Sequence, residues 1–77
     1  MKKGKCMLWK HSDDMYTLRS SKGLWFTIAV YKGSRPQSIS TTRIMASDDY
    51  IPSGGVLLPT IPVFLKYTVY GLQGIEQ

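Results

Sequence analysis

Apolar and polar residues alternate along much of the chain with a period of two, which is the spacing of side chains along a β-strand. The longest such segment covers residues 24–32 and is rich in β-branched and aromatic residues. One of its faces is expected to point into the core because it carries only apolar side chains: Leu24, Phe26, Ile28 and Val30. The other face would then present two aromatic rings, Trp25 and Tyr31, at the surface.

Five more segments carry strand-type residues, and polar or Gly/Pro-rich stretches separate them. We expect strands over residues 6–10, 15–19, 37–45, 56–58 and 63–70. The longest break covers residues 46–55, where Ser47 could cap a single helical turn. No segment predicts a full helix, and the tail over residues 71–77 is expected to fray. Short strands with turns every 8–12 residues favour an all-β fold, as a small barrel or a sandwich.

The length and the cysteine content limit how this fold is stabilised. Seventy-seven residues make one domain, over residues 1–77, and a domain of this size is only marginally stable alone. Cys6 is the only cysteine, so no intrachain disulfide can form, and one cysteine with one histidine cannot build a structural zinc site. We therefore expect a homodimer, because association is the simplest remaining source of stability.

The net charge of +5 is unevenly distributed along the chain. Residues 1–45 hold nine Lys/Arg and two acids, which gives +7, whereas residues 46–77 hold one lysine and three acids, which gives −2. A strongly basic half suits a polyanionic partner, and the other half suits packing or self-association. Solubility alone is the other explanation of the positive charge.

Several classes of function lack the residues that they need. Catalysis requires a positioned base, nucleophile or metal, and the only histidine, His11, lies in a segment predicted to be a polar turn. The paired acids at residues 13–14 and 48–49 are more typical of turns in solvent than of a metal site. We expect no enzyme activity, no metal and no cofactor. Since no apolar stretch fits a signal peptide or a membrane span, we expect no membrane association and a cytoplasmic location, the host cytoplasm if the protein is viral.

Cations recur beside aromatic residues in the basic half of the chain. Proteins that bind single strands combine cations, which contact phosphates, with aromatic rings, which stack on bases. The residues expected to form such a nucleic-acid-binding site are Arg19, Lys22, Trp25, Phe26, Tyr31, Lys32, Arg35 and Arg43. Aromatic residues of a small β-protein also build its core, so several rings of this chain are expected to pack inside.

The chain resembles the gene V class of single-stranded DNA-binding proteins of filamentous phages. Residues 20–27, Ser-Ser-Lys-Gly-Leu-Trp-Phe-Thr, are similar to the family's Ser-x-x-Gly-x-Pro-Tyr-Ser/Thr element in the DNA-binding wing. Arg35-Pro36 lies near the position of a proline in the family, and residues 50–59 resemble a later segment that leads into a strand. Leu24-Trp25 departs from the pattern, and the C-terminal strand keeps only Lys66 as a basic residue.

This resemblance implies a five-stranded, OB-like barrel with a protruding hairpin, which dimerises and coats single-stranded DNA cooperatively. It places Phe26 at a base-stacking position and Lys22 in the basic wing, with Arg19 and Ser21 nearby. The alternation instead turns Phe26 inward, unless the wing projects beyond the barrel.

Two functions follow as hypotheses. The first is a single-stranded DNA-binding protein, with DNA more expected than RNA, of the kind that serves phage DNA replication. The second is a small phage- or plasmid-type interaction protein that inhibits a host protein through an apolar surface or edge strand, using residues 56–58 and Phe64.

Overall fold

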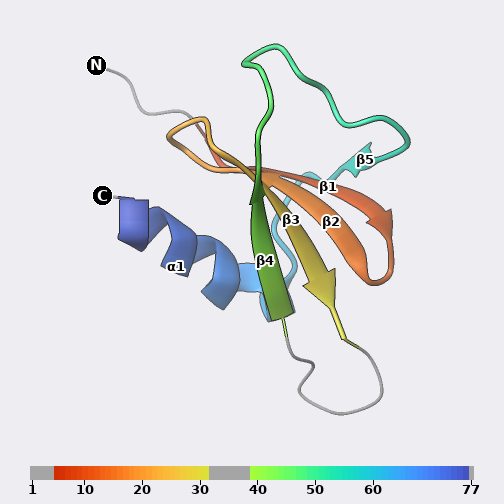
Figure 1. The fold of residues 1–77 in the computed structure, drawn as a ribbon. Helices are drawn as coiled ribbons and strands as arrows, with labels where there is room; N and C mark the ends of the chain where they lie inside the picture. Colours follow the sequence, from red (N-terminus) through yellow and green to blue (C-terminus); the bar gives the residue numbers. More distant parts are fainter. Residues whose placement is uncertain (1–4, 32–38, 77) are drawn as a thin grey trace.

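The computed structural model describes residues 5–31 and 39–76 of the protein. This part of the chain forms one antiparallel β-sheet followed by a helical segment (Figure 1). Its elements follow one another as β1 (Met7–Ser12), β2 (Met15–Arg19), β3 (Trp25–Val30), β4 (Ile39–Ile44), β5 (Val56–Leu57), the 3-10 helix η1 (Val63–Leu65) and α1 (Lys66–Glu76). The strands lie in the order β4-β3-β2-β1-β5. The predicted five-stranded, mostly β fold is therefore confirmed.

The sheet is not closed into a barrel, so this part of the prediction is wrong. Strands β1 to β4 pair each with the next, and β5 returns to pair with β1, which leaves β4 and β5 as the two edges. β5 pairs over only two residues, opposite Trp9 and Lys10. Pro59, two residues beyond the end of β5, has no N–H to donate to a further strand, which suits an edge position.

Residues 20–27, which were expected in a projecting wing, form a turn and the start of an interior strand. Trp25 and Phe26 begin the interior strand β3, where they pair with β2 on one side and with β4 on the other. They lie within the sheet rather than on a hairpin that projects beyond it. The connection from β2 to β3 is a turn over residues 20–24.

One face of the sheet carries the core, as the alternation predicts. Its buried residues are Leu8, Tyr16, Leu18, Phe26, Ile28 and Val30, and the helical segment adds Leu65 and Val69. Figure 1 shows α1 alongside the sheet, on the side away from the β4–β5 connection. The removal of this apolar area from water is the main force that holds the helix on the sheet.

Residues 63–70 were expected to form a strand, but they form η1 and the start of α1. Leu65 and Val69 are both 0% exposed, and Leu72 packs partly against the same core. Their spacing of four and then three residues places them on one face of a helix. Tyr67, which a strand would put on the same face as Leu65, is 90% exposed. Residues 71–76, expected as a frayed tail, belong to α1.

Pro62 precedes this helical segment with φ −57° and ψ 147°, and the amide of Leu65 donates to its carbonyl at 3.0 Å. Proline is favoured at a helix start, where its missing N–H has no helical partner to lose. Within residues 5–31 and 39–76, no helix has both the length and the apolar character that crossing a bilayer requires.

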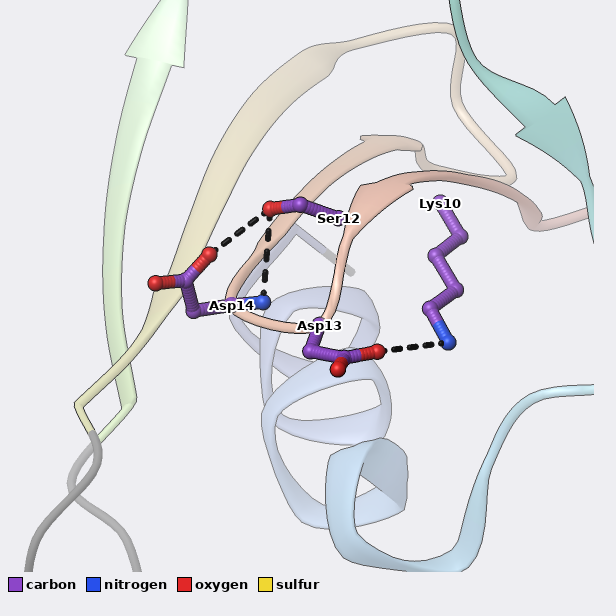
Figure 2. Close-up of polar contacts among 4 residues, drawn as sticks. All are labelled: Lys10, Ser12, Asp13 and Asp14. Atoms are coloured by element: carbon purple, nitrogen blue, oxygen red, sulfur yellow. Dashed lines mark hydrogen bonds and ion pairs between the residues drawn. The ribbon is translucent and has the colours of Figure 1, made fainter.

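Hydrogen bonds and an ion pair within the turn hold the hairpin of β1 and β2 (Figure 2). The Ser12 hydroxyl donates to Asp14 Oδ1 at 2.7 Å and accepts from the Asp14 amide at 3.4 Å. Lys10 Nζ lies 3.1 Å from Asp13 Oδ1. The acids at residues 13–14 thus stabilise a solvent-facing turn, as predicted. His11 lies in β1 rather than in the turn, with Nε2 2.7 Å from Thr17 Oγ1.

Candidate nucleic-acid interface

The face of the sheet opposite α1 forms a hollow of about 480 Å³, which we call the tryptophan groove. The side chains of Met7, Trp9, Arg19 and Trp25 rise from this face, because each strand directs every second residue to it. Part of the β4–β5 connection completes the wall. The full lining comprises Met7, Trp9, Arg19, Trp25, Asp48, Asp49, Tyr50, Ile51 and Leu57.

Three aromatic rings meet in the groove. Trp25 lies opposite Arg19, and Trp9 lies opposite Thr17, so the two tryptophans flank β2 from either side. Their rings reach across β2 to a centroid distance of 5.5 Å with an interplanar angle of 33°. Tyr50 approaches Trp25 edge-on, with centroids 5.1 Å apart and planes at 87°. Such tilted and edge-on pairs contribute about 0.5–1.5 kcal/mol each beyond their buried area.

Arg19 connects the rings to the β4–β5 connection. Its guanidinium carbon lies 5.1 Å from the Trp25 ring centroid, within the range of a cation–π interaction. Its Nη1 donates a hydrogen bond of 3.0 Å to the carbonyl oxygen of Asp48. The side chain is half-buried, so the cation is fixed in position and still borders the groove.

The turn after Arg19 presents the exposed Lys22. The buried Ser20 organises this turn, because its hydroxyl accepts hydrogen bonds from the amides of Lys22 and Leu24 at 3.3 and 3.2 Å. Gly23 has φ +86°, a conformation that favours glycine. A Cβ added to Gly23 would lie 3.6 Å from Arg19 Nη2, so the turn lies directly beside the guanidinium. The turn that carries Lys22 therefore lies next to the Arg19 end of the groove.

Two acidic residues of the β4–β5 connection, Asp48 and Asp49, also line the groove. The Ser47 hydroxyl donates to Asp49 Oδ1 at 2.7 Å, and this hydrogen bond, with one from the Asp49 backbone, lowers the pKa of the Asp49 carboxyl. The amide of Tyr50 donates to the Ser47 carbonyl at 3.1 Å. The segment predicted as a possible helical turn is thus a hydrogen-bonded turn. Among the residues that the structure describes, no group of three His, Cys, Asp or Glu could hold a metal ion.

The expectation that Trp25 is exposed is wrong. Trp25 is 2% exposed and Trp9 is 8% exposed, because Tyr50 and its neighbours lie over the face that the alternation predicted to be open. Phe26 is 8% exposed and packs in the core on the opposite face, as the alternation predicts. The base-stacking position that the family resemblance implies for Phe26 is therefore inside the protein.

The other predicted site residues do not gather at the groove. Tyr31 is 56% exposed but lies six residues beyond Trp25, which is about 20 Å along an extended chain. Arg43 is exposed and pairs opposite Phe26, so it belongs to the face that carries α1. Lys32 and Arg35 lie outside the described residues. Of the predicted set, the structure brings together Arg19 and Trp25, and the turn that carries Lys22 lies beside Arg19.

Sequence reasoning missed Trp9 and Tyr50 as members of the site. A signal for Trp9 existed, because pairing the predicted strands over residues 6–10 and 15–19 as a hairpin places it two residue pairs from Arg19, on the same face of the sheet. Tyr50 lies in an irregular connection, whose path across the sheet no local pattern predicts.

No family model matches this chain, and neither a curated protein nor a solved structure matches it. The resemblance to the gene V class therefore stays a prediction.

Proposed function

We propose that this protein binds single-stranded nucleic acid, DNA in preference to RNA, with bases in the tryptophan groove and phosphates on Arg19 and Lys22. One observation carries the proposal: two tryptophans and Arg19 line the same groove, and the turn that carries the exposed Lys22 lies beside the Arg19 guanidinium. The preference for DNA follows only from the resemblance to the gene V class.

The two parts of the site supply different contributions to affinity. Stacking of a base on an aromatic ring contributes about 1–3 kcal/mol and tolerates any base. Contacts with phosphates release counterions, so the logarithm of the affinity falls linearly with the logarithm of the salt concentration, by about 0.7 per phosphate for single strands. The groove volume of about 480 Å³ lies in the range of small-ligand sites, roughly 300–1,000 Å³.

The chain provides its own reporter for this site. It contains two tryptophans, and both line the groove, so any ligand that stacks there should quench the total tryptophan emission.

Replacement of Lys22 tests the phosphate contact. Lys22→Ala should weaken binding to oligodeoxythymidylate and make the plot of log affinity against log salt shallower by about 0.7. Lys66→Ala is the matched control, because Lys66 is exposed at the start of α1, across the sheet from the groove. Equal effects of the two substitutions would show that binding depends only on net charge, and the proposed site would be rejected.

A second candidate function is supported by exposed apolar residues at the β5 edge. Val56 is 66% exposed and Leu57 is 49% exposed, and β5 is the last strand of the sheet. An edge of this kind offers backbone groups and apolar side chains to a partner strand. Of the other residues first assigned to this surface, Leu58 packs partly against the core and Phe64 lies edge-on to Tyr16 at 6.3 Å. A protein retained from nuclease-treated lysate by the wild type and lost in Val56→Lys would favour this candidate.

The proposal includes cooperative coating of the strand by a homodimer in the cytoplasm. Val63 and Tyr67, 77% and 90% exposed on the helical segment, are apolar or aromatic surface that self-association would cover. Sedimentation of the free protein at several concentrations measures its mass, and a monomer at all of them would remove the dimer from the proposal.

A further inference from the structure

The tryptophan groove holds free volume, but the rings of its two tryptophans are covered in the state that the structure describes. Trp25 is 2% exposed and Trp9 is 8% exposed, so neither ring offers a free face of the size that stacking needs. A base that stacks on Trp25 must take a position that part of the protein now occupies.

The covering part is the segment of residues 46–51, which we call the cover. Tyr50 packs edge-on against Trp25, and the Asp48 carbonyl accepts the hydrogen bond from Arg19. These are the ring contact and the side-chain hydrogen bond that tie the cover to the sheet in the described part of the chain. The cover's other hydrogen bonds, from Ser47 to Asp49 and from Tyr50 to Ser47, lie within it and need not break if it moves as a unit.

The boundaries of the cover also favour displacement. Met45, just before it, is 90% exposed, and Ile51, at its end, is 74% exposed, so neither side chain holds it down through burial. Pro52 is buried and marks the point at which the chain is again fixed to the body of the protein.

The closed state leaves one polar group without a partner. The Nε1 of Trp25 is buried and makes no hydrogen bond. An indole N–H in this situation loses its bond to water and gains nothing in exchange. Withdrawal of the cover restores water to it, or allows an acceptor on a bound base, such as a carbonyl oxygen, to reach it.

We infer that the cover is a displaceable lid, and that Tyr50 occupies on Trp25 the position that an unpaired base takes in the complex. The inference depends on the proposed function for the identity of the ligand. Binding then exchanges the contact between Tyr50 and Trp25 for a contact between the base and Trp25. The free energy of binding is less favourable by the free energy of the contacts that the lid gives up.

Removal of the Tyr50 ring tests the lid in the free protein and in the complex. Tyr50→Ala should increase quenching of tryptophan emission by acrylamide, and should raise the affinity for oligodeoxythymidylate by about 2- to 10-fold, the range for one lost aromatic pair. Thr60→Ala is the control, because Thr60 is exposed between β5 and η1 and lines neither the groove nor the proposed dimer surface, and it should change neither quantity. Reduced affinity in Tyr50→Ala would overturn the inference, because Tyr50 would then itself hold the strand.

Amide hydrogen exchange of the wild-type protein supplies a test that needs no variant. Oligodeoxythymidylate should accelerate exchange over residues 46–51, because the lid is released, while it slows exchange over the turn at residues 20–24. Slower exchange over both segments would overturn the lid. If neither the wild type nor Tyr50→Ala binds the oligonucleotide, the proposed function is rejected. Acrylamide quenching of the free proteins then decides for or against the lid.

Discussion

Trp25 is the residue on which the fold and the proposed site both depend, so its replacement gives the sharpest prediction. The ring is 2% exposed, contacts Trp9 and Tyr50, and lies under the Arg19 guanidinium. Trp25→Ala removes all three contacts and leaves a cavity, and substitutions of this type cost about 3–5 kcal/mol. A domain of 77 residues has a total stability of roughly 4–12 kcal/mol.

Equilibrium unfolding in urea measures this loss. With a denaturant dependence of about 1 kcal/mol per molar, which suits a small domain, the midpoint should fall by about 3 M or more. Trp25→Phe should lose clearly less, because it keeps a ring in place and removes the buried indole N–H that has no partner. Thr60→Ala, at an exposed position outside the proposed dimer surface, should stay within about 0.5 kcal/mol of the wild type.

A loss below about 1 kcal/mol in Trp25→Ala would refute the reasoning, since only a ring already in solvent is removed so cheaply. DNA affinity of this variant is meaningful only at temperatures where circular dichroism shows it to be folded. Under those conditions its affinity should fall while the salt dependence keeps the wild-type slope, because stacking rather than charge is lost.

Two further predictions concern local conformation. Gly23 and Gly54 both have positive φ, +86° and +79°, so alanine at either position should destabilise the protein by about 1–2 kcal/mol. Only Gly23→Ala should also lower the affinity for oligodeoxythymidylate, because its turn presents Lys22. Equal affinities of the two variants would show that this turn does not belong to the binding site. Ser47→Ala should raise the pKa of Asp49 toward its ordinary value in an NMR titration, and an unchanged pKa would remove the serine as its cause. Because the hydrogen bond lowers the folded-state pKa, its contribution to stability is present at neutral pH and is lost as the pH falls through that pKa.

The strands and their faces could be predicted because a period of two is visible in the sequence itself. β2 begins and ends at the predicted residues, and β3 and β4 lie within the predicted segments. Phe26, Ile28 and Val30 face the core as expected. In each case the local pattern and the tertiary packing favour the same structure.

The C-terminal helix was mistaken for a strand because two periods fit the same residues. Leu65 and Val69 share a face in either structure, and the β-branched and aromatic residues around them favour a strand on propensity alone. Packing against the core decides between them. The apolar face of the sheet must be shielded from water, and a helix buries Leu65, Val69 and Leu72 together against it.

The site was predicted only in part because burial on the second face of the sheet depends on a distant segment. The alternation correctly places Trp25 and Arg19 on this face, but Tyr50, 25 residues after Trp25, decides whether the ring is exposed. Tertiary contacts of irregular segments have no periodic signal, so a pattern analysis leaves the face open.

Comparison of single-stranded and duplex DNA of the same sequence tests the central claim most directly. Each is titrated at low salt into the wild-type protein, and the tryptophan emission from the groove is followed. The account predicts that the single strand quenches the emission and binds more tightly than the duplex, whose bases are paired and cannot enter the groove. Unchanged emission with the single strand, or equal affinity for both forms, would contradict it.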